Sequence, residues 1–86
     1  MMNKIFEGKK ILITGGTGSL GQALTKRLLK LDVDTIRIFS RNENNQITME
    51  SKMGDDRLRF LLGDIRDRER LIRATEDIDI VFHTAA

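Results

Sequence analysis

The chain has 86 residues, of which 40% are hydrophobic and 33% charged, values typical of one small globular domain rather than a disordered chain. Lysine and arginine number 15 against 13 acidic residues, and this near balance gives no reason to expect nucleic-acid binding. The absence of Cys excludes disulfides, and a single His excludes a His-rich metal site. No stretch approaches the roughly 18 apolar residues that span a bilayer, and residues 1–10 lack the apolar run of a signal peptide, so we expect no membrane segment and a cytoplasmic location.

Strand and helix patterns alternate from residue 10 onward. Residues 10–14 form a short, apolar, β-branched run closed by glycines, which predicts a strand buried on both faces. Apolar residues spaced three and four apart predict an amphipathic helix over 19–31. A second strand is expected over 35–40, followed by a short helix within 41–56, where several Asn residues dilute the apolar pattern.

The same alternation continues to the end of the chain. A third strand is predicted over 58–62, a helix capped by Asp67 and ending near Glu76, and a fourth strand over 78–83. Successive βαβ units of this kind predict a Rossmann-type α/β fold, a doubly wound parallel sheet with strand order 3-2-1-4. We expect one Rossmann-type domain over 1–86, truncated after its fourth strand.

Three glycines, Gly15, Gly18 and Gly21, lie directly after the first strand and open the first helix. A tight turn, close approach of the backbone to a pyrophosphate and close helix–strand packing each favour a residue without a Cβ. The amides of Ser19 and Leu20 would then face the phosphates. The predicted cofactor-binding residues of this loop are Gly15, Thr17, Gly18, Ser19, Leu20 and Gly21.

The glycine loop allows two other interpretations. A nucleoside-triphosphate P-loop requires Lys and then Ser or Thr after its last glycine, whereas Gly21 is followed by Gln22 and Ala23. An ordinary glycine-rich turn between strand and helix stays open as the alternative without a ligand.

Ser40 and Arg41 stand at the end of the second strand, where NAD-selective domains place an acidic residue that binds ribose hydroxyls. A guanidinium can pair with a 2′-phosphate and a Ser hydroxyl can add a hydrogen bond. The predicted cofactor is therefore NADP in preference to NAD. A solvated Arg41 is the alternative, and Glu43 could still reach a ribose.

Asp64 and Ile65 follow the third strand at its carboxyl end, where ligands bind in open α/β sheets. The carboxylate could accept a hydrogen bond from an adenine amino group while Ile65 packs on the ring; a loop Asp that caps local backbone is the alternative. At the end of the fourth strand, Ala85 and Ala86 are expected to border the nicotinamide ribose. His83 is expected to be structural rather than catalytic.

Taken together, these residues resemble the extended short-chain dehydrogenase/reductase superfamily, whose Thr-Gly-x-x-Gly-x-x-Gly motif matches Thr14, Gly15, Gly18 and Gly21. More narrowly, the chain resembles the CapD-type polysaccharide biosynthesis proteins, which include inverting UDP-N-acetylglucosamine 4,6-dehydratases. The segments that carry this resemblance are 11–21, 39–43, 55–60, 63–67 and 81–86. Where that family usually reads Ser-Arg-Asp-Glu, this chain has Asn42 in place of the Asp.

The resemblance implies an NADP-dependent nucleotide-sugar 4,6-dehydratase or epimerase of polysaccharide biosynthesis, a homo-oligomer acting on a UDP-N-acetylglucosamine-like substrate. Its Tyr-x-x-x-Lys pair would lie beyond Ala86, and the chain contains no Tyr, so no catalytic residue and no metal ligand is assigned here. Two alternatives stay open: a non-enzymatic dinucleotide-binding regulatory module, and a fragment that self-associates through its exposed strand edge.

Overall fold

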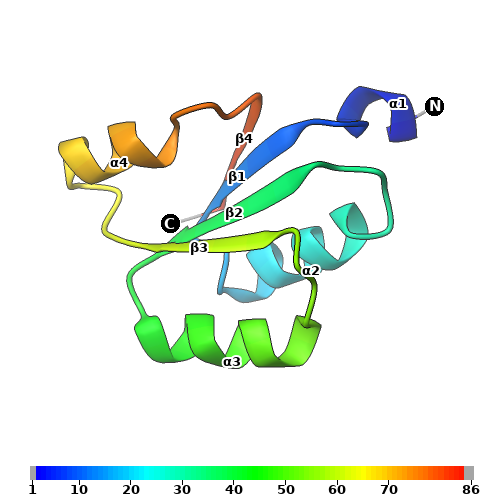
Figure 1. The fold of residues 1–86 in the computed structure, drawn as a ribbon. Coiled ribbons are helices and arrows are strands. Elements are labelled where there is room, and N and C mark those ends of the chain that lie inside the picture. Colours follow the sequence, from blue (N-terminus) through cyan, green and yellow to red (C-terminus); the bar gives the residue numbers. More distant parts are fainter. Residues whose placement is uncertain (1, 85–86) are drawn as a thin grey trace.

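The computed structural model describes residues 2–84 and consists of a parallel sheet with helices on both faces (Figure 1). The strands are β1 (Lys10–Thr14), β2 (Thr35–Ser40), β3 (Leu58–Leu62) and β4 (Ile80–His83). The helices are α1 (Met2–Phe6), α2 (Ser19–Leu28), α3 (Glu43–Met53) and α4 (Arg68–Ala74). Every neighbouring pair is parallel and the sheet order is β3-β2-β1-β4, which confirms the predicted Rossmann-type topology.

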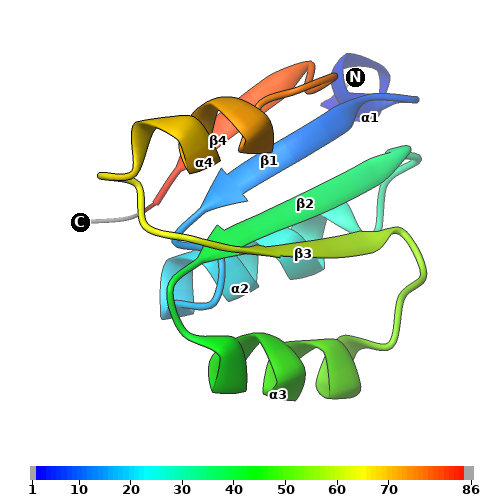
Figure 2. The same ribbon diagram turned by 60° about the vertical axis from the view of Figure 1, so that its left-hand side comes forward.

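The two faces of the sheet are covered by different helices, α2 and α3 on one side and α4 on the other (Figure 2). Successive side chains of a strand point to opposite faces, so Ile11 and Ile13 enter the core under α2 and α3. Leu12, between them, packs with Phe39 and Ala74 on the α4 side. All of these side chains are fully buried, and β1 therefore has the two buried faces that its apolar sequence predicts.

Parallel pairing brings the carboxyl ends of β1, β2 and β3 to one edge of the sheet. Backbone hydrogen bonds continue past the strand ends, from the Gly15 amide to the Phe39 carbonyl and from the Gly63 amide to the Ser40 carbonyl, both 2.8 Å. The loops that follow these three strands are thereby held side by side, and they carry most of the predicted binding residues.

Helix α2 ends at Leu28, three residues earlier than the apolar spacing predicts. The Arg57 guanidinium donates to the carbonyls of Leu29 (2.6 Å) and Leu31 (2.8 Å). A side chain distant in sequence thus pairs two carbonyls in the turn after the helix. Had α2 continued to residue 31, these carbonyls would have been at its C-terminal end, where helix carbonyls lack partners within the helix. The apolar spacing continued to Leu31 because that side chain packs against the same core from the turn after the helix.

Two further boundaries differ from the sequence expectations: the C-terminal end of α4 and the first residue of β4. Helix α4 begins after the predicted cap, Asp67, but stops at Ala74, whose carbonyl accepts a 2.7 Å hydrogen bond from Arg37. Strand β4 begins at Ile80 rather than at residue 78, because the preceding Asp79 exchanges hydrogen bonds with the backbone of Lys10.

Helix α1 is not expected from the sequence, which has no apolar periodicity over its five residues. Its last residue, Phe6, packs on Phe82 with ring centroids 6.0 Å apart, so a tertiary contact supports the turn. In the part of the chain that the structure describes, no helix is long and apolar enough to cross a membrane.

Candidate functional site

The glycine corner, which we define as Gly15–Gly21, has a backbone course that side chains would obstruct. Gly15 has φ +69°, in the left-handed region that glycine favours. A Cβ built on Gly21 would lie 2.5 Å from the Cα of Gly16, and one on Gly16 would lie 2.6 Å from Cγ2 of Ile38. Gly18 differs, because its Cβ would approach only the Gly15 carbonyl, at 3.4 Å. The fold therefore requires the glycines at both ends of the corner but leaves room for a methyl group at Gly18.

Helix α2 begins with unpaired amides. Its N-cap, Gly18, offers no side-chain cap, whereas Asn42 and Asp67 cap α3 and α4 by accepting from backbone N–H groups. The first bond of α2 runs from the Gln22 amide to the Gly18 carbonyl, 2.9 Å. The N–H groups of the first helical turn, residues 19–21, consequently have no partner within the helix and present partial positive charge.

A cleft of about 680 Å³ lies along the edge of the sheet where the three strand ends meet, a size suited to a small organic ligand. Of the predicted binding residues, those that line it are Gly15, Thr17, Gly18, Ser40, Arg41, Asp64 and Ile65. The sequence analysis did not single out four other lining residues for binding: Phe39, Asn42, Asn45 and Arg66. Gly63 and Thr84, which flank predicted residues, also line the cleft.

Three residues of the predicted loop lie outside the lining of the cleft. Gly21 is buried against Gly16, so its role is to let α2 approach β1. Ser19 is exposed, and the side chain of Leu20 is 66% exposed, which leaves only their main chain in a position suited to the predicted role. The predicted Ala85 and Ala86 lie outside the described residues.

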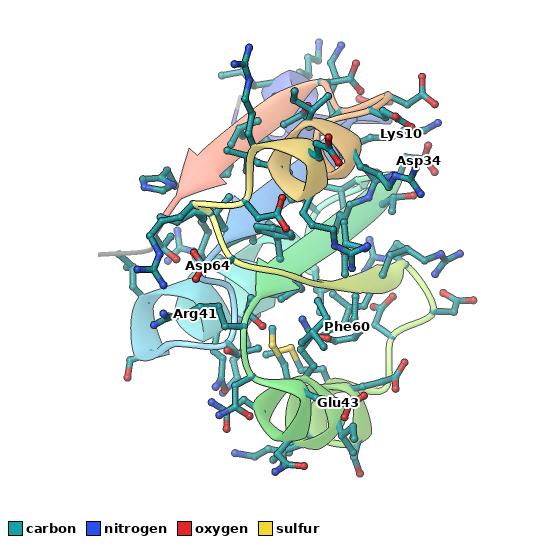
Figure 3. All side chains as sticks on the ribbon, turned by 90° about the vertical axis from the view of Figure 1, so that its left-hand side faces the viewer. Lys10, Asp34, Arg41, Glu43, Phe60 and Asp64 are labelled. Atoms are coloured by element: carbon teal, nitrogen blue, oxygen red, sulfur yellow. The ribbon has the colours of Figure 1, made fainter. Side chains whose placement is uncertain are left out.

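The rim of the cleft, which we define as Ser40–Asn42 and Asp64–Arg66, carries one carboxylate between two guanidiniums. Arg41 Nη1 lies 3.7 Å from Asp64 Oδ2 (Figure 3), and its side chain is 72% exposed. Arg66 holds the same carboxylate through its backbone N–H (2.8 Å) and through Nη2 (2.8 Å). These hydrogen bonds, with a smaller attraction from Arg41, hold the pKa of Asp64 well below its usual range. An adenine amino group would have to share this carboxylate with Arg66.

Arg66 lines the cleft although the sequence analysis assigned it no role. Its side chain is 79% exposed, yet it folds back on Asp64. The spacing of two residues permits this, because the Asp64 side chain also accepts from the Arg66 amide. Glu43 opens α3 and lies apart from the Arg41–Asp64 pair (Figure 3).

A hydrogen bond from a residue of α3 holds the side chain of Ser40 in place. Ser40 is 7% exposed and lines the cleft, while Gln46 Nε2 donates to Ser40 Oγ (2.9 Å) and to the Leu61 carbonyl (3.1 Å). Gln46 is equally buried. The apolar pattern of α3 does not predict a role for Gln46. A buried polar side chain can be recognised as functional only when the structure shows its hydrogen-bond partners.

Thr14, His83 and Thr84 join the ends of β1 and β4. Thr14 Oγ1 lies 2.6 Å from His83 Nδ1, and Thr84 Oγ1 donates to the Thr14 carbonyl, 2.6 Å. The imidazole thus joins the ends of two neighbouring strands. No group of three His, Asp or Glu side chains within residues 2–84 is arranged to hold a metal ion.

Sheet order, crossover helices and the glycine corner together define a Rossmann-type fold of the short-chain dehydrogenase/reductase kind. The family model described as polysaccharide biosynthesis protein matches residues 11–86. The chain belongs to this family.

Proteins of known sequence agree with this placement. Similar proteins include the uncharacterized membrane protein MJ1061 of Methanocaldococcus jannaschii (42% identity, 99% of this chain and 26% of the relative) and an inverting UDP-N-acetylglucosamine 4,6-dehydratase of Campylobacter jejuni (48%, 95% and 25%). UDP-glucose 4-epimerase of Rickettsia bellii is 43% identical over 95% of this chain and 25% of the relative. The chain spans about a quarter of the length of these curated relatives.

Solved structures give the same fold. Pen from Bacillus thuringiensis superposes with a TM-score of 0.91 at 41% identity, covering 94% of this chain and 25% of that one. WbmF of Bordetella bronchiseptica, solved with NAD+, gives 0.74 at 26% (94% and 24%). A Veillonella parvula short-chain dehydrogenase/reductase solved with NADP gives 0.72 at 26% (87% and 34%). One of these structures contains NAD+ and another contains NADP, so the structural similarity is compatible with either dinucleotide.

Proposed function

We propose that this chain is the NADP-binding portion of a nucleotide-sugar dehydratase or epimerase that acts in polysaccharide biosynthesis. The family membership and the enzymes named among the relatives support the coarse class. The specific activity, a UDP-N-acetylglucosamine 4,6-dehydratase-like lyase reaction, rests on the similarity to the Campylobacter jejuni enzyme. Catalytic residues and most sugar contacts would come from outside residues 1–86, and the cytoplasmic location and homo-oligomeric state stay predictions.

The observation that carries the proposal is the set of unpaired amides at the start of α2, beside a cleft lined by Gly15 and Gly18. Unsatisfied N–H groups and the helix dipole favour an anion, and the missing side chain at Gly18 lets a bulky diphosphate approach. Asn42 and Asp67 already cap the other two long helices, so the start of α2 is the helix end suited to this role among residues 2–84.

The remaining cleft residues fit the other parts of a dinucleotide. Ile65 offers an apolar surface and Asp64 an acceptor for an adenine ring, while Ser40 and Arg41 are donors for a phosphate on the adenosine ribose. Since Asp64 already pairs with Arg41, a 2′-phosphate would replace one anionic partner of this guanidinium by another. A bound nicotinamide dinucleotide supplies hydride transfer; the residues of this chain bind and orient it.

The test is calorimetric titration of the protein with NADP and with NAD at matched ionic strength. We expect both to bind and NADP to bind more tightly, because only NADP offers a phosphate to Ser40 and Arg41. Equal affinity, or tighter binding of NAD, would contradict the NADP assignment, and binding of neither would contradict the cofactor role itself.

A second function, self-association, is favoured by strand β4. Within the described residues β4 pairs with β1 alone, and Val81 is 50% exposed. An unpaired apolar edge of this kind is suited to pairing with another chain. Size-exclusion chromatography over a dilution series is expected to show a concentration-dependent dimer if this is so; a monomer at all concentrations would contradict it.

A further inference from the structure

The buried contact between Ser40 and Gln46 links α3 to the rim of the cleft. Gln46 Nε2 lies 2.9 Å from Ser40 Oγ and 3.1 Å from the Leu61 carbonyl oxygen. A carbonyl oxygen can only accept a hydrogen bond, so the Gln46 atom that faces it must be the amide nitrogen. The partner on the β3 backbone therefore fixes the orientation of the amide, independently of any choice between its oxygen and nitrogen positions.

This fixed orientation determines what the Ser40 hydroxyl can do. The second proton of the amide points at Ser40 Oγ, which consequently acts as the acceptor in this bond. The O–H bond of Ser40 must then point in another direction. Among residues 2–84 the structure gives that proton no acceptor, while Ser40 itself lines the cleft beside Arg41.

We propose that Gln46 is a positioning residue for cofactor selectivity, which holds Ser40 as an obligate hydrogen-bond donor toward the ribose phosphate of NADP. This inference rests on the proposed NADP-binding function and adds to it a residue outside the cleft lining. An aligned O–H donor and the Arg41 guanidinium at one rim suit a phosphate monoester dianion, whose terminal oxygens can only accept hydrogen bonds. A ribose hydroxyl, which can also donate, gains less from a partner fixed as a donor.

The geometry is rigid enough for this role. Ser40 pairs with Leu62 in the β2–β3 register, and its carbonyl accepts from Gly63. Gln46 and Ser40 are each 7% exposed, so water does not compete freely for the bond. A buried polar contact that joins a helix to two strands keeps the hydroxyl aligned before the ligand arrives, which reduces the ordering needed on binding.

The test compares Gln46→Met, Ser40→Ala and the double variant with wild type, and measures the ratio of the NAD to the NADP dissociation constant by calorimetry. Methionine has a similar length but no donor. We expect Ser40→Ala to lower the ratio about tenfold, Gln46→Met to lower it about threefold or more, and the double variant to match Ser40→Ala alone. A merely structural Gln46 would weaken both dinucleotides equally and leave the ratio unchanged.

An unchanged ratio in Gln46→Met, or a further fall when it is added to Ser40→Ala, would overturn the inference. A wild type that does not prefer NADP would instead overturn the proposed function, so the two failures are distinguishable. Circular dichroism verifies folding of each variant.

If Gln46→Met does not fold, Gln46→Glu provides a second test. An ionised Glu would accept the Ser40 proton and draw it away from the cleft, so the selectivity ratio of this variant should fall as the carboxyl ionises with rising pH, relative to wild type at the same pH. A ratio that follows wild type at every pH would overturn the inference.

Discussion

The glycine corner and the rim face the same cleft but are built in opposite ways. The corner is main chain, packed so closely that a Cβ on Gly21 would lie only 2.5 Å from the Cα of Gly16. The rim is made of side chains, and its two guanidiniums are 72% and 79% exposed. One region is therefore fixed by steric exclusion and the other by hydrogen bonds and charge.

This difference separates binding from discrimination. Backbone amides recognise a diphosphate that NAD and NADP share, and their position is inseparable from the packing of α2 on β1. Side chains at the rim meet the part in which the two dinucleotides differ, and they can change without disturbing the core. Substitutions in the two regions should consequently have different signatures, and four predictions test this.

The largest effect is expected for Gly21→Ala. Its methyl group would overlap Gly16 and push α2 from the sheet, which should lower the free energy of unfolding by about 1–3 kcal/mol and weaken both dinucleotides. Urea unfolding and titration measure the two effects. Wild-type stability in this variant would contradict the steric account of the corner.

Gly18→Ala is the matched substitution within the same corner. Because its Cβ would meet only the Gly15 carbonyl at 3.4 Å, stability should stay within about 0.5 kcal/mol of wild type. Both dinucleotides should nevertheless bind about tenfold more weakly, since the methyl group displaces phosphate from charge-assisted hydrogen bonds with the amides. Unchanged affinity would show that the phosphates do not approach Gly18.

At the rim, Arg41→Ala should weaken NADP about tenfold and leave NAD nearly unchanged. The side chain is 72% exposed and pairs only loosely with Asp64, so thermal unfolding should be little affected. Arg68→Ala, an exposed arginine of α4 outside the cleft, is the control and should bind both dinucleotides as wild type does. Equal loss of both dinucleotides in Arg41→Ala would place Arg41 away from the phosphate that distinguishes them.

The smallest effect concerns acid stability. Arg66 holds the pKa of Asp64 below its unfolded value, so the pair stabilises the fold fully above the unfolded pKa, about 3.9, and this stabilisation is lost as pH falls toward the folded pKa. Thermal unfolding between neutral and strongly acidic pH should therefore show a larger loss for wild type than for Asp64→Asn. Identical pH profiles would mean that the ion pair contributes nothing to stability.

The sequence predicted most of what the main chain dictates. Apolar runs placed all four strands, and glycine spacing placed the corner, because these patterns follow from local geometry and burial on one element. The end of α2 was predicted too late because Arg57, distant in sequence, binds the carbonyls of the turn that follows the helix, at Leu29 and Leu31. Helix α1 was missed because a tertiary contact, Phe6 on Phe82, supports it.

The candidate site was predicted less completely for a similar reason. Ser40, Arg41 and Asp64 each stand at a strand end, a position visible in the sequence. Gln46 and Arg66 act through partners, Ser40 and Asp64, and such pairing has no sequence motif. Local rules therefore predict which loops meet, whereas the contacts that orient their side chains require the structure.

The most direct test of the central claim is ¹H–¹⁵N correlation NMR of the protein titrated with NADP. The account predicts that the amides of residues 19–21 shift strongly and saturate with the same dissociation constant as the Arg41 signals, because these main-chain N–H groups bind the diphosphate. Saturating shifts confined to the rim, with the amides of the glycine corner unmoved, would contradict it.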